Sequence, residues 1–258
     1  MRALAEYPHA FLEIEGIERI ETDRYLVLLG EGDDPRLRSV ERLRLSSNPE
    51  KEVRAVRKAV LKRGFRDSTW WVGPSTSPPN LVPALIRLGM ERHRESSLEM
   101  MALCVADLAP RLSGGIEVRP AATKGEVYKA LEIRNQAFGI AYEPDLVSRG
   151  LSASVDQNSE EVVVLAWHQE FEQPISMGIV SVAEHGAYLA TAATLPEARR
   201  RGGYSAIVLE RCRLAAERGC AWVATQAGSE SRPGLTSLGF AELGSITVLV
   251  DRLLADQD

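Results

Sequence analysis

Residues 196–206, with the sequence PEARRRGGYSA, place arginines and glycines where the sequence predicts a strand followed by a helix. Glycines let a backbone approach a ligand closely, and the first N–H groups of a helix have no acceptor within it. Because the helix dipole also favours negative charge there, this pattern predicts a phosphate-binding loop. A Walker loop is excluded because no Gly-Lys-Ser/Thr follows, and a dinucleotide fingerprint because the G-x-G-x-x-G spacing is absent. The alternative is a solvated arginine turn that caps an ordinary helix.

The spacing of this loop resembles the acyl-CoA loop of the GNAT acetyltransferases, which reads Arg/Gln-x-x-Gly-x-Gly/Ala. Arg199, Gly202 and Tyr204 occupy its three fixed positions, although Gly or Ala is usual where Tyr204 stands. The resemblance implies an α+β protein with a mixed α/β sheet, the GNAT fold. It also implies an acyltransferase that moves an acetyl group from acetyl-CoA directly to an amine.

The same resemblance assigns residues to the co-substrate. The loop would bind the diphosphate through backbone N–H groups and through charge-assisted hydrogen bonds from arginine. The preceding strand would pair with the pantetheine arm along its free edge, and Ala193 or Leu195 would donate an N–H to the thioester oxygen. The residues expected to bind acetyl-CoA are Ala193, Thr194, Leu195, Arg199, Arg200, Arg201, Gly202, Gly203, Tyr204 and Ser205.

The amine needs a base, because an alkyl ammonium with a pKa of about 10.4 is almost entirely protonated at neutral pH. Glu184 and His185 are the candidates by position, since they lie at a predicted turn between two central strands. Glu143 and Asp145 could reach the site from the helix side. A solvated turn without a catalytic role is the alternative for each of them.

The departing thiolate needs a proton, which the family commonly takes from a tyrosine whose position here is Leu235. The asparagine usual a little earlier is replaced by Gly228. Tyr204 or Tyr188 could donate the proton instead, so Tyr204 is a catalytic candidate as well as a loop residue. If no donor is present, the chain is a CoA-binding sensor or interaction protein, which is the alternative to an enzyme.

The second half of the chain predicts the elements that position the loop. Thr123-x-x-Glu126 is a capping box for a helix that ends near Gly139. Val208, Cys212 and Ala215 recur at helical spacing after the loop. The other elements predicted are a short helix at 144–149, a loop at 151–160, strands at 162–167, 175–182, 187–193, 220–225 and 246–250, and a helix at 235–238.

The first half resembles the second and predicts an internal repeat. Three dipeptides recur in the same order: Arg63-Gly64, Trp71-Val72 and Leu88-Gly89 in the first half, and Arg218-Gly219, Trp222-Val223 and Leu238-Gly239 in the second. The first copy lacks the Arg-Gly loop, so it is expected to be a degenerate GNAT-like module that does not bind CoA. We place the modules at 1–112 and 116–258, with a flexible boundary at Ser113-Gly114-Gly115. Chance similarity is the alternative, because each repeated word is short.

Composition narrows the class of protein. A net charge of −5 argues against broad binding to nucleic acid. The apolar runs are too short for a membrane span or a signal peptide, and the scattered cysteines are expected to be buried and reduced, so we expect a cytoplasmic location with no membrane partner. The four histidines lack metal-ligand spacing, which predicts no metal site. The expected substrate is a small-molecule amine, and an edge strand near the C-terminus could form a homodimer.

Overall fold

The computed structural model describes residues 1–12, 16–31, 37–108, 115–139, 159–184 and 186–253. Contacts divide the chain into two compact units, each made of two chain segments. Unit 1 comprises residues 1–15 and 101–242, and unit 2 comprises residues 16–100 and 243–258. The module boundary expected at residues 113–115 stays a prediction, because residues 109–114 lie outside the described part of the chain.

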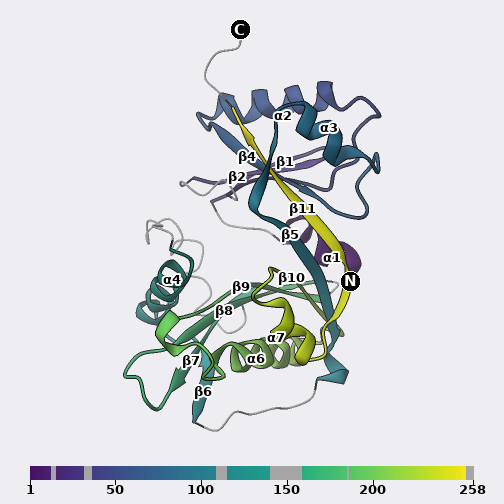
Figure 1. Ribbon diagram of the computed structural model, residues 1–258. Helices are drawn as coiled ribbons and strands as arrows, with labels where there is room; N and C mark the ends of the chain where they lie inside the picture. The colour runs from purple at the N-terminus through teal and green to yellow at the C-terminus, as the bar shows by residue number, and fades with distance from the viewer. Residues whose placement is uncertain (13–15, 32–36, 109–114, 140–158, 185, 254–258) are drawn as a thin grey trace. The chain divides into compact units, whose positions relative to one another are not determined.

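Unit 1 contains a mixed sheet with the strand order β5-β10-β9-β8-β7-β6 (Figure 1). Its strands are β5 (Glu91–Cys104), β6 (Ile116–Pro120), β7 (Glu161–His168), β8 (Ser176–Ala183), β9 (Gly186–Thr194) and β10 (Trp222–Ala227), and β5 belongs to this unit only from residue 101. The pairs β6–β7, β7–β8 and β8–β9 are antiparallel, whereas β10 runs parallel to β9. The strands expected at 162–167, 175–182 and 187–193 are confirmed, and β6 was not anticipated.

Helices cover both faces of this sheet (Figure 1). They are α1 (Arg2–Glu6), α4 (Lys124–Phe138), α6 (Gly203–Glu217) and α7 (Arg232–Ser237), with 3₁₀ turns η1 (Pro8–Ala10), η3 (Val105–Asp107) and η5 (Pro196–Ala198). Ile207 and Val208 of α6 and Leu235 of α7 pack on one face, in a core with alternate residues of β7 to β10. Val127 and Leu131 of α4 pack on the opposite face. The unit therefore has three layers, with β8 and β9 at the centre.

The start of α4 confirms the predicted capping box. The Glu126 N–H donates to Thr123 Oγ1 at 3.2 Å, and the Glu126 carboxylate accepts from the Ala122 N–H at 2.7 Å. Arg119 donates twice to the same carboxylate, and these bonds hold the pKa of Glu126 below its ordinary value. The helix ends at Gly139, whose φ of 63° is left-handed. The helix expected at 144–149 and most of the loop expected at 151–160 lie outside the described residues.

Unit 2 contains the strand order β1-β2-β3-β4-β11-β5. Its elements besides β5 are β1 (Glu18–Glu21), β2 (Leu26–Leu29), β3 (Arg38–Glu41), α2 (Glu50–Lys62), β4 (Asp67–Val72), α3 (Leu81–Arg87) and β11 (Ala241–Arg252), the last entering this unit at residue 243. Val53, Val56 and Val60 of α2 pack with Trp70 and with α3 in one core, as their spacing predicts.

The order of elements confirms an internal repeat. The series β3, α2, β4, α3, β5 is followed later in the chain by β9, α6, β10, α7, β11, and β3–β4 and β9–β10 are both parallel pairs. The two Trp-Val dipeptides, however, do not occupy equivalent positions in their strands. Trp71 is near the end of β4, whereas Trp222 is the first residue of β10. The two copies thus share an order of elements, and the loops that join those elements differ in length.

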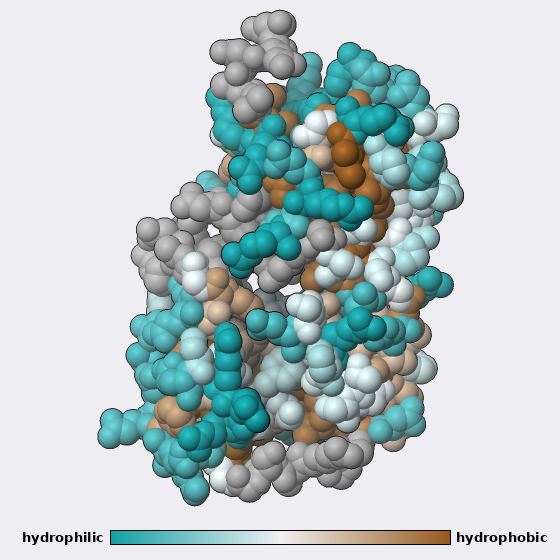
Figure 2. Space-filling view, viewed as in Figure 1, coloured by the Kyte–Doolittle hydropathy of each residue, from teal (hydrophilic) through white to brown (hydrophobic). Residues whose placement is uncertain are grey.

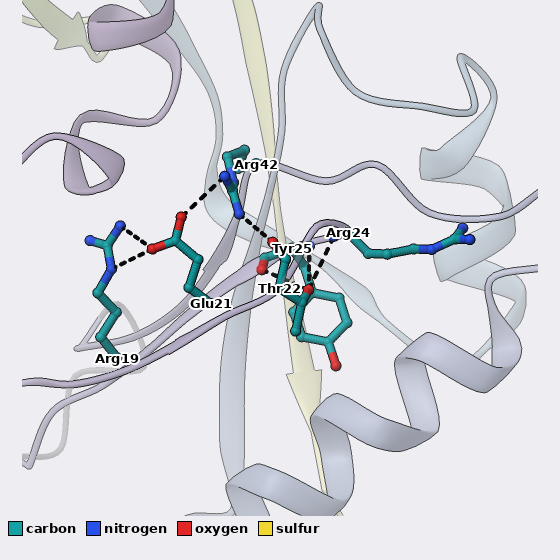
Figure 3. Close-up of polar contacts among 6 residues, drawn as sticks. All are labelled: Arg19, Glu21, Thr22, Arg24, Tyr25 and Arg42. Atoms are coloured by element: carbon teal, nitrogen blue, oxygen red, sulfur yellow. Dashed lines mark hydrogen bonds and ion pairs between the residues drawn. The ribbon is translucent and has the colours of Figure 1, made fainter.

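In unit 2 an arginine follows β3 and is held by groups of the β1–β2 turn (Figure 3). Arg42 has a left-handed φ of 52° and donates to the Thr22 carbonyl. Its guanidinium also lies 3.1 Å from the Glu21 carboxylate, which accepts two hydrogen bonds from Arg19. Thr22 Oγ1 in turn accepts from the Tyr25 N–H at 3.0 Å and so shapes the turn. The charge of Arg42 is therefore satisfied within its own unit.

Hydrophilic residues predominate in the view of Figure 2, with apolar residues exposed among them. None of the described helices is long and apolar enough to cross a membrane. Cys212 and Cys220 are buried free thiols as expected, whereas Cys104 is only half-buried. Burial raises the pKa of Cys212 to about 12, so this thiol is unreactive at neutral pH.

Candidate functional site

The arginine and glycine residues singled out in the sequence form the connection between β9 and α6. The chain leaves β9 at Thr194, makes the turn η5, and enters α6 at Gly203. Two residues of the connection are left-handed: Arg200, with a φ of 65°, and Gly202, with a φ of 86°. A left-handed conformation costs an L-residue other than glycine roughly 1–2 kcal/mol, so Arg200 is strained while Gly202 is not.

This connection contains a run of backbone donors that have no acceptor among the described residues. The Arg199 N–H donates to Pro196, and the first bond of the helix is from the Ala206 N–H to the Gly202 carbonyl. Between them, no described residue accepts a hydrogen bond from the backbone N–H groups of residues 200 to 205. Gly202 is the N-cap and offers no side chain to them. The start of α6 is therefore a concentrated set of free donors at the positive end of a helix dipole.

Gly203 fixes how closely α6 approaches the sheet. A Cβ at this position would lie 2.3 Å from the hydroxyl oxygen of Ser176 and 3.1 Å from the Ile175 side chain. The Ser176 hydroxyl itself lies 2.9 Å from that of Thr194. The absence of a side chain at Gly203 thus lets the first turn of α6 sit against the beginning of β8, beside the end of β9.

The three arginines of the connection differ in their partners. All three are exposed, and Arg201 pairs with Glu170 at 2.7 Å. Within the described ranges, neither Arg199 nor Arg200 forms an ion pair or a side-chain hydrogen bond. Two guanidinium groups are therefore available to an anion held by the free N–H groups, whereas the third is already neutralised in part.

Strands β9 and β10 are paired only near their beginnings. The register joins Ala187 to Val223 and Tyr188 to Ala224, and Thr225 adds a side-chain bond to the Leu189 carbonyl at 2.8 Å. From Ala190 onward, β9 has no paired residue on β10. The later part of β9 therefore has an edge that an extended ligand could join, as in strand addition.

The choice of N–H donor on β9 needs correction. The Leu195 N–H donates to the Ile175 carbonyl at 2.9 Å, so it is occupied by β8. Backbone groups alternate in direction along a strand, so the Ala193 N–H is also directed toward β8. The N–H groups of Ala192 and Thr194 point to the other side, where β10 has separated. Ala192 was not anticipated, because the sequence does not reveal which side of β9 is paired.

Tyr204 finds room for its ring between α6 and α7. Its Cε1 atom lies 3.2 Å from where a Cβ on Gly234 would be, and its hydroxyl is hydrogen-bonded to Ser231. Burial raises the pKa of Tyr204, against the effects of the Arg211 charge and of Ser231. The phenol is therefore protonated at neutral pH and able to donate. Leu235, at the position where the family has tyrosine, is 2% exposed and belongs to the core.

The structure does not bring Glu184 close to the loop. Glu184 is exposed in the turn before β9, and His185, Glu143 and Asp145 lie outside the described residues. Strand residues rise by about 3.3 Å each, so Gly186 and Thr194 are separated by roughly 26 Å along β9. The loop residues 199–205 and the end of β9 are brought together, whereas Glu184 is at the far end of the strand.

Another carboxylate, Glu161, is the first residue of β7 and was missed. It is paired with Ser181, which is paired with Tyr188, so the three side chains form one row across β7, β8 and β9 on the α4 face. The Ser181 hydroxyl donates to Glu161 Oε1 at 3.3 Å. Burial raises the pKa of Glu161, although Ser181 and the charge of His9 lower it. An acidic residue that begins an apolar strand was the available signal.

Metal ligation receives no support from the side chains that are described, among which no group of three or more His, Cys, Asp or Glu residues could hold a metal ion. The chemistry available at the β9–α6 junction is that of hydrogen-bond donors and guanidinium groups. Such a set of groups is chemically suited to an oxyanion, in particular a phosphate or diphosphate.

Comparison with known proteins identifies the fold. No family model matches the sequence, and no curated protein matches it. Among solved structures, a GCN5-related N-acetyltransferase from Kribbella flavida has 19% identity and a TM-score of 0.69, with 92% of this chain and 90% of that chain covered. A GCN5-related N-acetyltransferase from Sphaerobacter thermophilus has 14% identity and a TM-score of 0.66, covering 95% and 84% of the two chains.

A third similar structure is described as a tandem GNAT protein from the clavulanic acid biosynthesis pathway. It has 14% identity and a TM-score of 0.62, with 95% of this chain and 86% of that chain covered. These likenesses extend over nearly the whole chain and show that it has the GNAT fold, as the loop and the order of elements predicted. At this level of identity the likeness concerns the fold alone.

Proposed function

We propose that this protein is an N-acetyltransferase that binds acetyl-CoA at the β9–α6 junction and transfers the acetyl group directly to an amine. The observation that supports this most strongly is the run of N–H groups from residue 200 to residue 205 for which no described residue is an acceptor. Arg199 and Arg200 add positive charge beside them. The GNAT fold supports the assignment, because the junction lies where that fold's acyl-CoA loop is expected.

In the proposed reaction, the neutral amine nitrogen attacks the thioester carbon. A C–N bond forms, the C–S bond breaks, and the electron pair of that bond leaves with the sulfur. In this proposal, the N–H groups of Ala192 and Thr194 stabilise the oxygen as it gains negative charge. A base removes the proton that the nitrogen carries, and the thiolate takes up a proton, so the products are an acetylated amine and free CoA.

Two carboxylates compete for the role of base. Glu184 was favoured by its place in the sequence, with His185 beside it, whereas Glu161 lies in the same row as Tyr188, the last residue of β9 that is paired with β10. Burial raises the pKa of Glu161, which makes this carboxylate a stronger base than an exposed one. We therefore expect Glu161→Gln to remove the acidic limb of the kcat/KM profile and Glu184→Gln to leave it unchanged. The opposite result would restore Glu184.

We assign the proton for the thiolate to Tyr204, whose phenol is protonated at neutral pH. Its ring lies beside Gly234 of α7, next to Leu235, which has no hydroxyl to donate. The second candidate function rests on the same position. Leu235 stands where the family usually has a tyrosine, and its side chain is packed in the core. The missing hydroxyl favours a CoA-binding sensor with little or no turnover.

Two measurements on the purified protein separate these functions. Calorimetry with CoA and with acetyl-CoA tests binding, and thiol release from acetyl-CoA in the presence of a panel of small amines, aminated antibiotics and peptide N-termini tests transfer. Binding with amine-dependent release supports the enzyme, and binding without release across the panel supports the sensor. Absence of binding to either nucleotide would overturn the assignment of the loop and both functions with it.

A further inference from the structure

Arg211 is the only described arginine that is fully enclosed in the core of unit 1, with 2% of its surface exposed. It lies on α6, two turns beyond the free N–H groups. In the part of the chain that the structure describes, no carboxylate pairs with its guanidinium group. Burial lowers the pKa of Arg211 to about 10, so the group still carries its charge at neutral pH. Burying a charge without a counter-ion costs several kcal/mol, and such a cost calls for a reason.

The acceptors of Arg211 are backbone carbonyls on two strands. Nη1 donates to the Ala190 carbonyl of β9 at 2.7 Å and to the Ile179 carbonyl of β8 at 3.0 Å. Nε donates to the Ile207 carbonyl of its own helix at 3.3 Å. One guanidinium nitrogen thus joins β8 to β9 at a single point, from the face that α6 covers.

That point is an irregularity of the sheet. Ile179 is paired with Ala190 but Gly178 with Ala192, so Thr191 is an extra residue on β9. An inserted residue of this kind bends its strand and breaks the regular ladder of hydrogen bonds. Arg211 binds both carbonyls of the last regular pair before the insertion. The bulge therefore has a dedicated side chain that holds the two strands in this register.

Gly178 makes room for this arrangement. A Cβ on Gly178 would lie 2.9 Å from both Cζ and Nε of Arg211, and 2.5 Å from the Ile207 side chain. A residue with a side chain at this position would therefore displace the guanidinium group. Gly178 of β8 thus leaves space for Arg211 of α6 beside the extra residue Thr191 of β9. Through Arg211, the helix that begins at the proposed phosphate loop contacts the bulge.

We propose that Arg211 is a positioning residue for acyl transfer: by fixing the bulge opposite Gly178, it directs the N–H groups of β9 beyond Thr191 into the space where β10 separates. This inference rests on the proposed function, since it assigns the thioester oxygen to those groups. Without Arg211, the Ile179 and Ala190 carbonyls lose their donor, and the strand relaxes toward a regular ladder. Ala192 and Thr194 then no longer point at the oxygen, while the loop at residues 199–205 is unaffected.

The test uses acetyl-CoA labelled with ¹³C at the acetyl carbonyl and compares Arg211→Met with the wild-type protein. Infrared difference spectra report polarisation of the bound carbonyl, and calorimetry reports affinity. We expect the wild-type protein to lower the carbonyl frequency, and R211M to bind acetyl-CoA within about threefold yet lose most of that shift. Loss of an oxyanion donor lowers kcat on the order of 100-fold, and the KM for acetyl-CoA should change little.

Two further variants keep the outcome decisive. Arg211→Lys retains the charge with fewer donors and should restore part of the shift and of kcat, which also serves if R211M fails to fold. Arg213→Met alters an exposed arginine of the same helix and should behave as wild type. An unchanged carbonyl shift and kcat in R211M would overturn the inference and leave the proposed function standing. If R211M does not fold, a carbonyl shift and kcat in R211K fully equal to those of the wild type would do the same. Absence of acetyl-CoA binding by the wild-type protein would overturn both.

Discussion

The starts of α2 in unit 2 and of α6 in unit 1 show how one arrangement of elements can be used in two ways. Each helix follows a strand that is paired in parallel with the next strand, and each connection contains an arginine with a left-handed φ: 52° at Arg42 and 65° at Arg200. No other described residue except glycine has a positive φ. The backbone path thus shares an unusual feature in both copies, although their sequences differ.

The two connections differ in what satisfies their polar groups. Ahead of α2, the Glu52 carboxylate accepts from the Ser46 N–H at 3.1 Å and from the Ser46 hydroxyl at 3.2 Å, and Glu50 adds a second acid to the first turn. Arg42 is likewise engaged by Glu21. Ahead of α6 there is no acid in the first turn, and Arg199 and Arg200 have no carboxylate partner among the described residues.

Under the proposed function, the difference indicates that an anion site at such a helix start depends on the absence of an internal anion. The dipole of α2 is already compensated by Glu50 and Glu52, so a diphosphate would meet like charge there. The dipole of α6 is uncompensated, and the free energy of its unpaired donors becomes available to a ligand. We infer that unit 2 keeps the helix for packing, through Val53, Val56 and Val60, and that unit 1 keeps it for binding as well.

The largest effect is expected from Gly202→Val. A β-branched residue resists a φ of 86°, so the connection should move to a negative φ and turn its N–H groups away from one another. We expect CoA affinity to fall by at least 100-fold, as measured by calorimetry, with the protein still folded by circular dichroism.

Gly219→Val is the matched control for that loss. Gly219 follows the other end of α6, has a φ of 78°, and has no atom within 4 Å of a Cβ built on it. The variant therefore introduces the same kind of backbone strain away from the loop and should retain CoA affinity. Equal affinity in G202V and wild type would show that the loop does not bind the diphosphate.

A smaller effect is expected from the arginine side chains. Arg199→Ala and Arg200→Ala should each weaken CoA binding about tenfold, because a charge-assisted hydrogen bond contributes roughly 1.5–3 kcal/mol. Arg201→Ala should weaken binding less, since Arg201 already pairs with Glu170 at 2.7 Å. Titrations at two salt concentrations should show a weaker salt dependence for R199A and R200A than for R201A. An equal loss in all three would remove the distinction drawn from the ion pair.

The sequence was sufficient to predict most of unit 1, because its signals are local. Thr123 and Glu126 define a cap, Gly139 and Gly219 end helices, and the apolar runs of β7 to β9 are long enough to identify strands. Strand β6 lacks such a signal, since its residues 116–120 include a glutamate, an arginine and a proline. Local patterns therefore predict long apolar elements well and short polar strands poorly.

The site was predictable only in part, for the same reason. The loop is contiguous, so Arg199, Gly202 and their neighbours could be identified from spacing alone. The roles of Glu161 and Arg211 depend on register: which strands are paired, where Thr191 is inserted, and which carbonyls face Arg211. Register joins residues far apart in the chain, and a single sequence contains no direct record of it.

The smallest effect is expected at the start of α2, from Glu52→Gln. Burial raises the pKa of Glu52, but hydrogen bonds from its own N–H and from Ser46, together with the Arg24 charge, lower it below the ordinary value overall. Because the folded-state pKa is depressed, the stabilisation is present above the unfolded value of about 4.3 and is lost as pH falls through the folded value. We expect E52Q to lower the free energy of unfolding by about 1 kcal/mol at pH 7.

Urea denaturation at pH 7 and pH 3 measures that difference, which should shrink at the lower pH as the wild-type carboxyl becomes protonated. CoA affinity serves as the second reading. It should be unchanged in E52Q, because Glu50 remains in the first turn of α2 and the connection has no Arg-Gly loop. If E52Q bound CoA at the start of α2, one carboxylate would account for the difference in CoA binding between the two helix starts. The glycines of the α6 connection would then matter less than its lack of acids.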